Sequence, residues 1–386
     1  MKQIKLSSVH IGGNEIKYIE SAIKRGEVSN YGENLDEFEN QLEVFFSKKS
    51  KIALLNSGTS AIHMALIHLG VKVGDEVICQ SFTFSASVNP IVYQGATPVF
   101  VDSEDETWNM CPLHLEKAIK DRISKGNRPK AIILVHSYGM PAKMDELISI
   151  SLKYNVPLIE DAAEALGSTY KGKKCGTFGE YGIISFNGNK IITTSGGGAL
   201  ICKTKKEKEK TLFLSTQARD DAPNYQHSEI GYNYSMSNIL AGIGRAQMEV
   251  LEDYVVLRRY VNDFYQELFK KTVGIKVLNE PESNYFSNHW LSCILIDEKI
   301  TGFNNESLRL ELLKHNIETR LLWKPMHMQP VFKEYPFYGT NVCEELFKKG
   351  LCLPSGSNLN LDDKNGIKEV VTKFLFNKKK KDFIRH

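Results

Sequence analysis

The stretch SFNGNKIITTSGGG, residues 185–198, decides the fold, because it carries one lysine through a glycine-rich turn between two apolar runs. The run YGII (181–184) enters the turn and the run ALI (199–201) leaves it, and both are typical of buried strands. A lysine held where water is scarce loses affinity for its proton, so the neutral amine of Lys190 can attack an aldehyde. The small residues leave room for a bulky partner near the backbone. Taken alone, the stretch fits a surface lysine in a glycine-rich loop equally well.

The composition indicates a globular chain of two domains, or of one large domain with a smaller appendage. The chain has 386 residues, of which 42% are apolar and 25% are charged, as in ordinary soluble proteins. A net charge of +3 provides no broad field for nucleic acid, and we interpret the lysine run 378–381 as a solvated tail. No segment approaches the ~18 apolar residues of a membrane span, and the first residues lack the apolar core of a signal peptide.

The seven cysteines are scattered and form no CxxC pair. This usage is typical of reduced thiols in a cytoplasmic protein. No group of cysteines and histidines has the spacing of metal ligands, so we expect no metal site.

Apolar runs that alternate with helical patterns predict an α/β fold with a mainly parallel central sheet flanked by helices. The predicted strands are residues 51–55, 76–79, 98–101, 131–135 and 156–159, and a helix with Gly70 as its C-cap follows the first of them. After about residue 245 the pattern changes to a long helical stretch, about 246–270, and then to short mixed elements. We therefore predict a large α/β domain over 1–245 and a small α+β domain over 246–386.

Two features of the first domain suit a phosphorylated aromatic ligand. The sequence SGTS (57–60) stands at a strand-to-helix turn, where backbone N–H groups and hydroxyls bind phosphate; a plain helix N-cap explains it equally well. The sequence SFTFSAS (81–87) sets Phe84 between small polar residues, so that its ring can stack on a heteroaromatic ring. The alternative is a core phenylalanine.

Two further features suit the same ligand. Glu160 and Asp161 end a buried strand, where a carboxylate needs a partner, and a protonated pyridine nitrogen is such a partner. The alternative is a helix N-cap aspartate. Ser185 offers a hydroxyl to a phosphate oxygen, and Lys190 offers the amine for a Schiff base. An aldehyde, a phosphate and a ring nitrogen together describe pyridoxal 5′-phosphate (PLP). The four features appear in an order and spacing that would let a single sheet bring them to one edge.

With these motifs in place, the chain resembles the DegT-type sugar aminotransferases, PLP enzymes of the aspartate-aminotransferase fold. The similarity runs from GGNE (12–15) to LPSG (353–356). The stretch NGNKIITTSGGG (187–198) is especially similar to the enzymes of the bacillosamine pathway, which aminate carbon 4 of a UDP-4-keto-6-deoxy-N-acetylhexosamine.

The resemblance implies a role for each motif. Lys190 would carry PLP covalently and then move the proton between substrate and cofactor, and Asp161 would pair with the pyridine nitrogen. Phe84 would stack on the ring, and the phosphate would be held by Gly58, Thr59 and Ser185. Glu164 is counted among the cofactor residues; many members carry His or Gln there, whereas the bacillosamine-type enzymes tend to have Glu. Asn233, in GYNY (231–234), would reach the cofactor phosphate of the neighbouring subunit, which implies a homodimer with shared active sites.

For the sugar nucleotide, the resemblance points to two segments. The first is Gly26-Glu27-Val28-Ser29, near the start of the chain. The second is RLLWKPMH (320–327), in which Arg320 and Lys324 are plausible diphosphate partners and Trp323 and His327 would contact base or sugar. Ordinary packing between domains is the alternative for Trp323 and His327. Ser235 stands where an arginine is usual in the family.

The sequence therefore predicts a cytoplasmic PLP-dependent aminotransferase that moves the amino group of L-glutamate to carbon 4 of a nucleotide-linked 4-keto-6-deoxy sugar. An aminotransferase of the same fold for 3-keto sugars, or for dTDP- or GDP-linked sugars, is the first alternative. The remote ones are a PLP-binding regulatory protein without turnover and a nucleotide-binding α/β protein without PLP.

Overall fold

An eight-stranded sheet forms the centre of the computed structural model, which describes residues 3–383, with side chains up to residue 378. All its printed strand pairings are parallel except the two that β9 makes with β1 and β8. The strand order is β1 (Lys51–Leu55), β9 (Gly198–Cys202), β8 (Tyr181–Ser185), β5 (Leu158–Asp161), β4 (Ala131–Val135), β2 (Glu76–Gln80), β3 (Thr97–Val101) and β14 (Phe337–Tyr338). The prediction of an α/β fold with a mainly parallel sheet is confirmed.

The predicted strands are found, and one of them is displaced along the chain. The expected strand 156–159 is β5, which begins at Leu158 and ends at Asp161. The apolar run suggested an earlier end, but the hydrogen-bond ladders with β4 and β8 continue through Glu160 and Asp161. Both acidic side chains are therefore held by the sheet itself, and this decides where they point.

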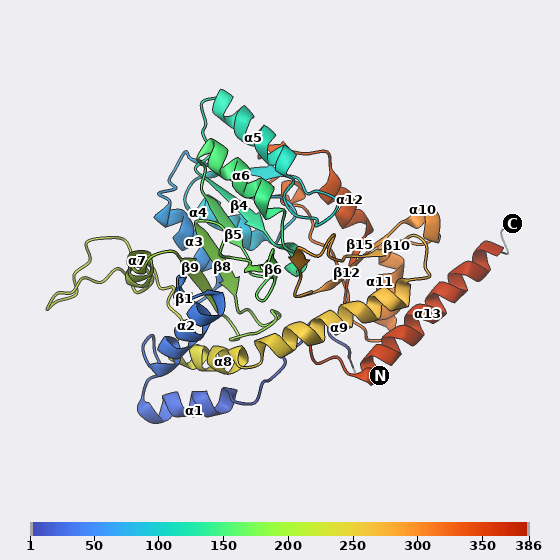
Figure 1. The fold of residues 1–386 in the computed structure, drawn as a ribbon, viewed down its shortest axis with the longest axis horizontal. Helices are drawn as coiled ribbons and strands as arrows, with labels where there is room; N and C mark the ends of the chain where they lie inside the picture. The colour runs from blue at the N-terminus through green and yellow to red at the C-terminus, as the bar shows by residue number, and fades with distance from the viewer. Residues whose placement is uncertain (1–2, 384–386) are drawn as a thin grey trace.

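Helices cover both faces of the sheet, as Figure 1 shows. Because successive side chains of a strand point to opposite faces, Ile133 of β4 packs with α3 (Gly58–His68) on one face. Ile132 and Leu134 pack with α5 (Pro112–Ser124) and α6 (Met144–Tyr154) on the other. Near β1, α2 (Glu33–Phe46) and α8 (Asn238–Met248) complete this second face. The helix predicted after residue 60 is α3, and Gly70 follows it in the left-handed region at φ +67°.

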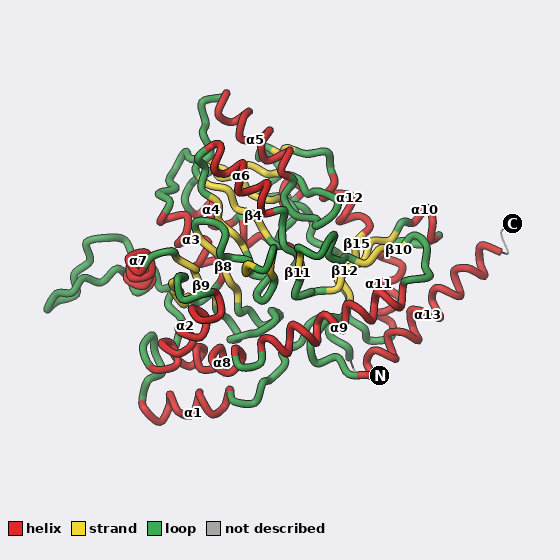
Figure 2. Tube along the Cα trace, in the orientation of Figure 1, coloured by secondary structure: helices red, strands yellow, loops and turns green. Residues whose placement is uncertain are grey.

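A second sheet of four antiparallel strands lies beside the first and is reached through α9 (Leu251–Phe269) (Figure 2). It has a core of its own, in which Val261, Ile294 and Val371 pack together. The predicted helix 246–270 is instead the end of α8 and all of α9, with a break at residues 249–250. The predicted boundary at 245/246 falls inside α8, and the division into two domains stays a prediction.

The remaining elements are short or lie at the periphery. The second sheet has the order β10 (Ile275–Val277), β12 (Ser292–Ile296), β15 (Gly350–Leu353) and β13 (Arg320–Leu321), and a third has the order β11 (Tyr285–Phe286), β6 (Thr169–Tyr170) and β7 (Lys173–Lys174). The other helices are α1 (Glu15–Arg25), α4 (Asn89–Tyr93), α7 (Lys205–Ser215), α10 (Glu298–Thr301), α11 (Asn305–Lys314), α12 (Val342–Lys349) and α13 (Leu361–Phe383), with 3-10 turns η1 (Ser85–Ser87), η2 (Ser137–Gly139) and η3 (Met326–Met328).

Among the residues that the structure describes, no helix is both long and apolar enough to cross a membrane. The lysine run 378–381 lies within α13, and the side chains of its last three residues are outside the described part.

Candidate active site

A cavity of about 400 Å³ opens at the carboxyl ends of β5 and β8, beside the first turn of α3. This is the edge at which open parallel sheets bind their ligands. Its wall includes seven of the predicted cofactor residues, namely Gly58, Thr59, Phe84, Asp161, Glu164, Ser185 and Lys190. The fold therefore brings the separate motifs of the first domain to one place.

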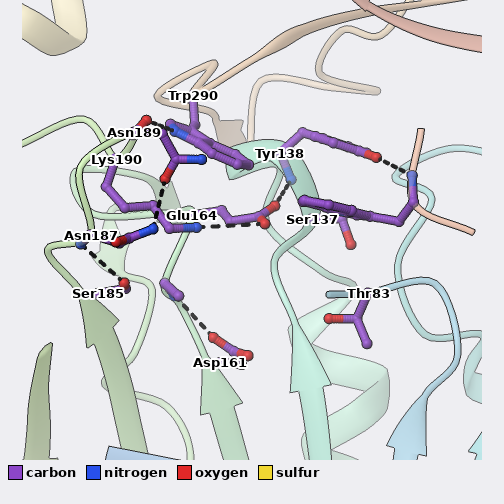
Figure 3. A network of polar contacts seen from close by, with 12 residues as sticks. Thr83, Ser137, Tyr138, Asp161, Glu164, Ser185, Asn187, Asn189, Lys190 and Trp290 are labelled. Carbon is purple, nitrogen blue, oxygen red and sulfur yellow. Dashed lines mark hydrogen bonds and ion pairs between the residues drawn. The ribbon is translucent and has the colours of Figure 1, made fainter. Parts of the chain in front are cut away.

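Lys190 enters the cavity from the turn between β8 and β9, and its side chain is only 13% exposed. Its Nζ lies 3.7 Å from Oε1 of Glu164 and 4.1 Å from the centre of the Trp290 ring (Figure 3). Burial lowers the pKa of the Lys190 amine, while the Glu164 carboxylate opposes this change. Burial likewise raises the pKa of Glu164, against the pull of Lys190. Both shifts favour a neutral amine, the form that attacks an aldehyde.

Asp161, rather than Glu160, faces the cavity. Because neighbouring side chains of a strand point to opposite faces, Glu160 turns the other way. It accepts hydrogen bonds from His136 Nε2 at 3.1 Å and from the backbone N–H groups of Gly176, Phe178 and Gly179. Asp161 accepts from the backbone N–H of Ala163 at 3.1 Å and is 5% exposed. A buried carboxylate at the cavity floor suits a protonated ring nitrogen.

The first turn of α3 forms a cradle against Ser185. Ser57 is the N-cap, and its hydroxyl accepts from the backbone N–H of Ser60 at 3.0 Å. A Cβ added to Gly58 would lie 3.2 Å from the Cβ of Ser185, so a larger residue would press on Ser185 and narrow the cradle. A helix N-terminus beside a hydroxyl suits a phosphate group. The amine, the carboxylate and the cradle together fit PLP.

Phe84 lies at the mouth of the cavity and is 53% exposed. Its ring centre is 5.3 Å from that of Trp323. The alternative of a core phenylalanine does not hold, because its neighbour Phe82 takes that place and is fully buried.

Two predicted groups lie away from this cavity within the chain. Asn233 is exposed, and its backbone oxygen accepts from Asn56 Nδ2 at 3.1 Å. The segment 26–29 follows α1 and is held to α8, where Asn238 Nδ2 donates to the carbonyl of Glu27 at 2.7 Å. Gly26, Glu27, Val28 and Ser29 do not line the cavity. Within one chain, these residues therefore contribute nothing to the wall of this cavity.

The segment 320–327 is divided among several places. Arg320 and Trp323 line a second cavity of about 550 Å³, which shares Asn189, Trp290 and Trp323 with the first. Arg320 is exposed and pairs with Glu318 at 2.9 Å. Lys324 lines a third, more open cavity that also contains Phe84.

His327 is held in packing. Its Nδ1 lies 2.7 Å from the Ser81 hydroxyl, its Nε2 lies 3.3 Å from a Glu344 oxygen, and its ring stacks on Phe337 at 3.8 Å. These contacts agree with the alternative interpretation of His327 as a packing residue.

Sequence reasoning missed Trp290 and Tyr138. The Trp290 ring covers Lys190, and its indole N–H donates to the carbonyl of Asn189 at 2.8 Å. The backbone N–H of Tyr138 donates to Oε2 of Glu164 at 2.6 Å, and the Tyr138 ring stacks between Trp290 and Trp323. Trp290 is 100 residues from Lys190 in sequence, and no local motif marks either residue.

A buried lysine, a strand-end carboxylate and a helix-terminal cradle on this sheet define the chain as a PLP-dependent transferase. Residues 9–374 match the model of the DegT/DnrJ/EryC1/StrS aminotransferase family, and the chain belongs to that family. It is a PLP-dependent sugar aminotransferase.

Three relatives cover nearly the whole chain. The protein named "Putative pyridoxal phosphate-dependent aminotransferase EpsN" of Bacillus subtilis is 48% identical, over 96% of this chain and 95% of its own. GDP-perosamine synthase of Escherichia coli O157:H7 is 35% identical, over 98% of this chain and 100% of its own length. The UDP-4-amino-4,6-dideoxy-N-acetyl-beta-L-altrosamine transaminase of Campylobacter jejuni is 30% identical, over 98% of this chain and 99% of its own length.

The solved structures agree with these relatives. The PMP-form of "Putative sugar aminotransferase Spr1654" from Streptococcus pneumoniae has a TM-score of 0.88 and 25% identity, and covers 98% of this chain and 99% of its own. The same protein has also been solved in a PLP-form. The prediction of PLP as the cofactor is confirmed.

Proposed function

We propose that this enzyme moves the amino group of L-glutamate to carbon 4 of a nucleotide-linked 4-keto-6-deoxy sugar, with a UDP-linked N-acetylhexosamine as the first candidate. The observation that carries the proposal is the buried Lys190 amine, which faces the same cavity as Asp161 and the α3 cradle. The names of the relatives support a sugar nucleotide as acceptor. The product would supply bacterial glycan or glycoprotein synthesis in the cytoplasm.

Each residue of the cavity has a task in this proposal. Bound PLP supplies an electron sink that stabilises negative charge on the carbon being deprotonated. Lys190 holds the cofactor covalently and then moves a proton to or from that carbon. Asp161 holds the ring nitrogen in its protonated form. The N–H groups of Gly58 and Thr59 and the hydroxyl of Ser185 hold the phosphate.

Water is kept from the Lys190 amine by its surroundings. The Trp290 ring covers one side of Nζ, and Glu164 lies on another. The indole N–H of Trp290 also fixes the carbonyl of Asn189, so the turn that carries Lys190 is held from the second sheet's side. The lysine therefore has a defined position from which to transfer a proton.

The sugar nucleotide would occupy the second cavity, which opens beside the first. Arg320 is exposed there and free to rotate from Glu318 toward a diphosphate. Trp323 lines both cavities and contacts Phe84, and Lys324 lines the third cavity together with Phe84 and Trp323. We assign sugar or base contact to Trp323, and we keep His327 as a residue that positions this segment.

A homodimer with shared sites completes the proposal. Asn233 and the segment 26–29 lie outside the cavity of their own chain, and Val28 is 50% exposed. In a dimer, Asn233 would reach the partner's cofactor phosphate, and Gly26, Glu27, Val28 and Ser29 would contact the partner's sugar nucleotide.

A GDP-linked 4-keto sugar is the second candidate acceptor, because the GDP-perosamine synthase is 35% identical and the UDP-sugar transaminase 30%. A 3-keto sugar, a dTDP-linked sugar or a regulatory protein without turnover has no comparable observation in its favour.

The test has two stages. PLP is added to the purified protein, and an absorption band at about 400–430 nm that L-glutamate moves to about 330 nm would support the donor half-reaction. The aminated enzyme is then offered UDP-, GDP- and dTDP-linked keto sugars, and return of the first band identifies the acceptor. No band with the wild type, or the same band in Lys190→Ala, would refute the assignment of Lys190.

A further inference from the structure

The segment 81–87, which follows β2, brings more than Phe84 to the cavity. Thr83, Phe84 and Ser87 all line it. Phe84 is exposed at the mouth, whereas Thr83 and Ser87 are each 1% exposed, although both are polar. Buried hydroxyls need hydrogen-bond partners, so their partners show what these residues do.

The two hydroxyls form a chain that ends on Asp161. The Oγ of Ser87 donates to Oδ2 of Asp161 at 2.6 Å, and the Oγ1 of Thr83 lies 2.8 Å from the Oγ of Ser87. A hydroxyl carries one proton, and an ionised carboxylate only accepts. Ser87 therefore donates its hydrogen bond to Asp161, and Thr83 must be the donor in the hydrogen bond between Thr83 and Ser87. The hydrogen bonds therefore run in one direction, from Thr83 to Ser87 and from Ser87 to the carboxylate of Asp161.

These hydrogen bonds also account for the orientation of the Asp161 carboxylate. One of its oxygens accepts from Ser87 and the other accepts from the backbone N–H of Ala163. Two donors fix the plane of the carboxylate and leave its remaining lone pairs directed elsewhere. Figure 3 shows Thr83 and Asp161 at the same end of the site, with Lys190 and Glu164 at the other.

We propose that Ser87, supported by Thr83, is a positioning residue that holds the Asp161 carboxylate aimed at the ring nitrogen of the cofactor. This inference rests on the proposed function, in which Asp161 pairs with that nitrogen. The segment 81–87 would then fix the ring twice, through Phe84 at its face and through Ser87 and Asp161 at its nitrogen. Ser87 would act on the ring nitrogen through the Asp161 carboxylate, and Thr83 would act through Ser87.

The physical reason is the strength of a hydrogen bond to a charged group. A hydroxyl that donates to a buried carboxylate stabilises the ionised form more than the neutral form. Without Ser87, Asp161 would keep only the Ala163 donor, and its carboxylate would be held less firmly toward the ring nitrogen. A less firmly held negative charge would hold less positive charge on the ring nitrogen, and the electron sink would weaken.

The test compares Ser87→Ala with Ser85→Ala, a matched control in the same turn, η1. Ser85 is half-buried, and no side-chain hydrogen bond from it is seen among the described residues. For Ser87→Ala we expect the rate of the glutamate half-reaction at saturation to fall about ten- to hundredfold, as for loss of a hydrogen bond to a charged group. In Thr83→Val, Ser87 still donates to Asp161, so the rate of the glutamate half-reaction should fall only a few-fold.

A spectroscopic measurement separates positioning from folding. The absorption of bound PLP is titrated with pH in each variant. A less positive ring repels the proton on the Lys190–cofactor bond less, so the midpoint in Ser87→Ala should move to higher pH. Ser87→Thr keeps the hydroxyl and should restore the wild-type midpoint, while Ser85→Ala should not move it. Melting temperatures of the PLP-loaded proteins are measured in parallel.

The proposal is overturned if Ser87→Ala titrates and reacts like the wild type. It is also overturned if its rate falls only together with its melting temperature, with an unmoved midpoint, because that pattern describes a structural serine. Failure of the wild type to form a PLP band would refute the proposed function instead, so the two failures are distinguishable.

Discussion

Replacing Glu164 with glutamine should make the Lys190 amine easier to deprotonate. The two groups are 3.7 Å apart in a buried site, and the carboxylate raises the pKa of an amine that burial has lowered. Glutamine has the same shape and keeps an oxygen for the backbone N–H of Tyr138. The change therefore removes one charge and leaves the packing in place.

The magnitude follows from Coulomb's law. Opposite unit charges at the observed 3.7 Å attract by about 4 kcal/mol at an effective dielectric constant of roughly 20. Burial raises the pKa of Glu164 and so reduces its charge, which makes that figure an upper limit. A loss of about 2 kcal/mol corresponds to a roughly 30-fold larger fraction of neutral amine on the acid side of the titration.

The assay is the rate at which PLP attaches to the cofactor-free protein, followed by absorbance from about pH 6 to pH 10. Attachment needs the neutral amine, so the rate rises with pH to a plateau. In Glu164→Gln we expect the rise to begin at lower pH, with the plateau unchanged. A curve that stays in place or moves to higher pH would show that Glu164 does not hold the Lys190 proton, and would refute the reasoning.

Three further predictions test the site and its support. The double variant Lys190→Met with Glu164→Gln should stabilise the cofactor-free protein by about 1–4 kcal/mol near neutral pH, because it removes a buried pair of charges. This advantage should shrink, without vanishing, above the ordinary lysine pKa of 10.5, where only Lys190 is neutral, and below the ordinary glutamate pKa of 4.5, where only Glu164 is neutral, because the other group still carries a buried charge; a pH-independent difference in chemical denaturation would contradict it. Gly58→Ala should weaken PLP binding about tenfold, because the added Cβ would lie 3.2 Å from the Cβ of Ser185 and press on it; an unchanged PLP affinity in a fluorescence titration would show that this close approach does not shape the phosphate site. Asn288→Ala should cost about 3 kcal/mol in denaturant unfolding, because the buried amide pairs with the carbonyls of Glu164 and Leu166 and with the N–H of Trp290; a loss below about 1 kcal/mol would show that these groups find other partners.

The motifs whose parts are neighbours in sequence were predictable. The strand, turn and helix around residues 57–60, and the turn that carries Lys190, follow from apolar runs and small residues, and the structure places both at one cavity. The prediction was less complete for residues 320–327, where consecutive side chains reach different cavities and His327 turns into packing. An irregular segment of this kind has no repeating apolar pattern, so its sequence does not predict the direction in which each side chain points.

The sequence by itself determined the fold class, the order of the strands along the chain and the cofactor, and it predicted which lysine holds that cofactor. Those properties depend on local patterns, because a buried strand needs apolar side chains and a phosphate turn needs glycine. The resemblance had singled out Asp161, and the tertiary structure supplied the reason: Asp161 faces the cavity while Glu160 turns to His136, because adjacent strand residues point to opposite faces of the sheet. The tertiary structure alone brought Trp290 over Lys190 and joined Thr83 and Ser87 to Asp161. Contacts of this kind join residues far apart in the chain, and packing, rather than local propensity, sets them.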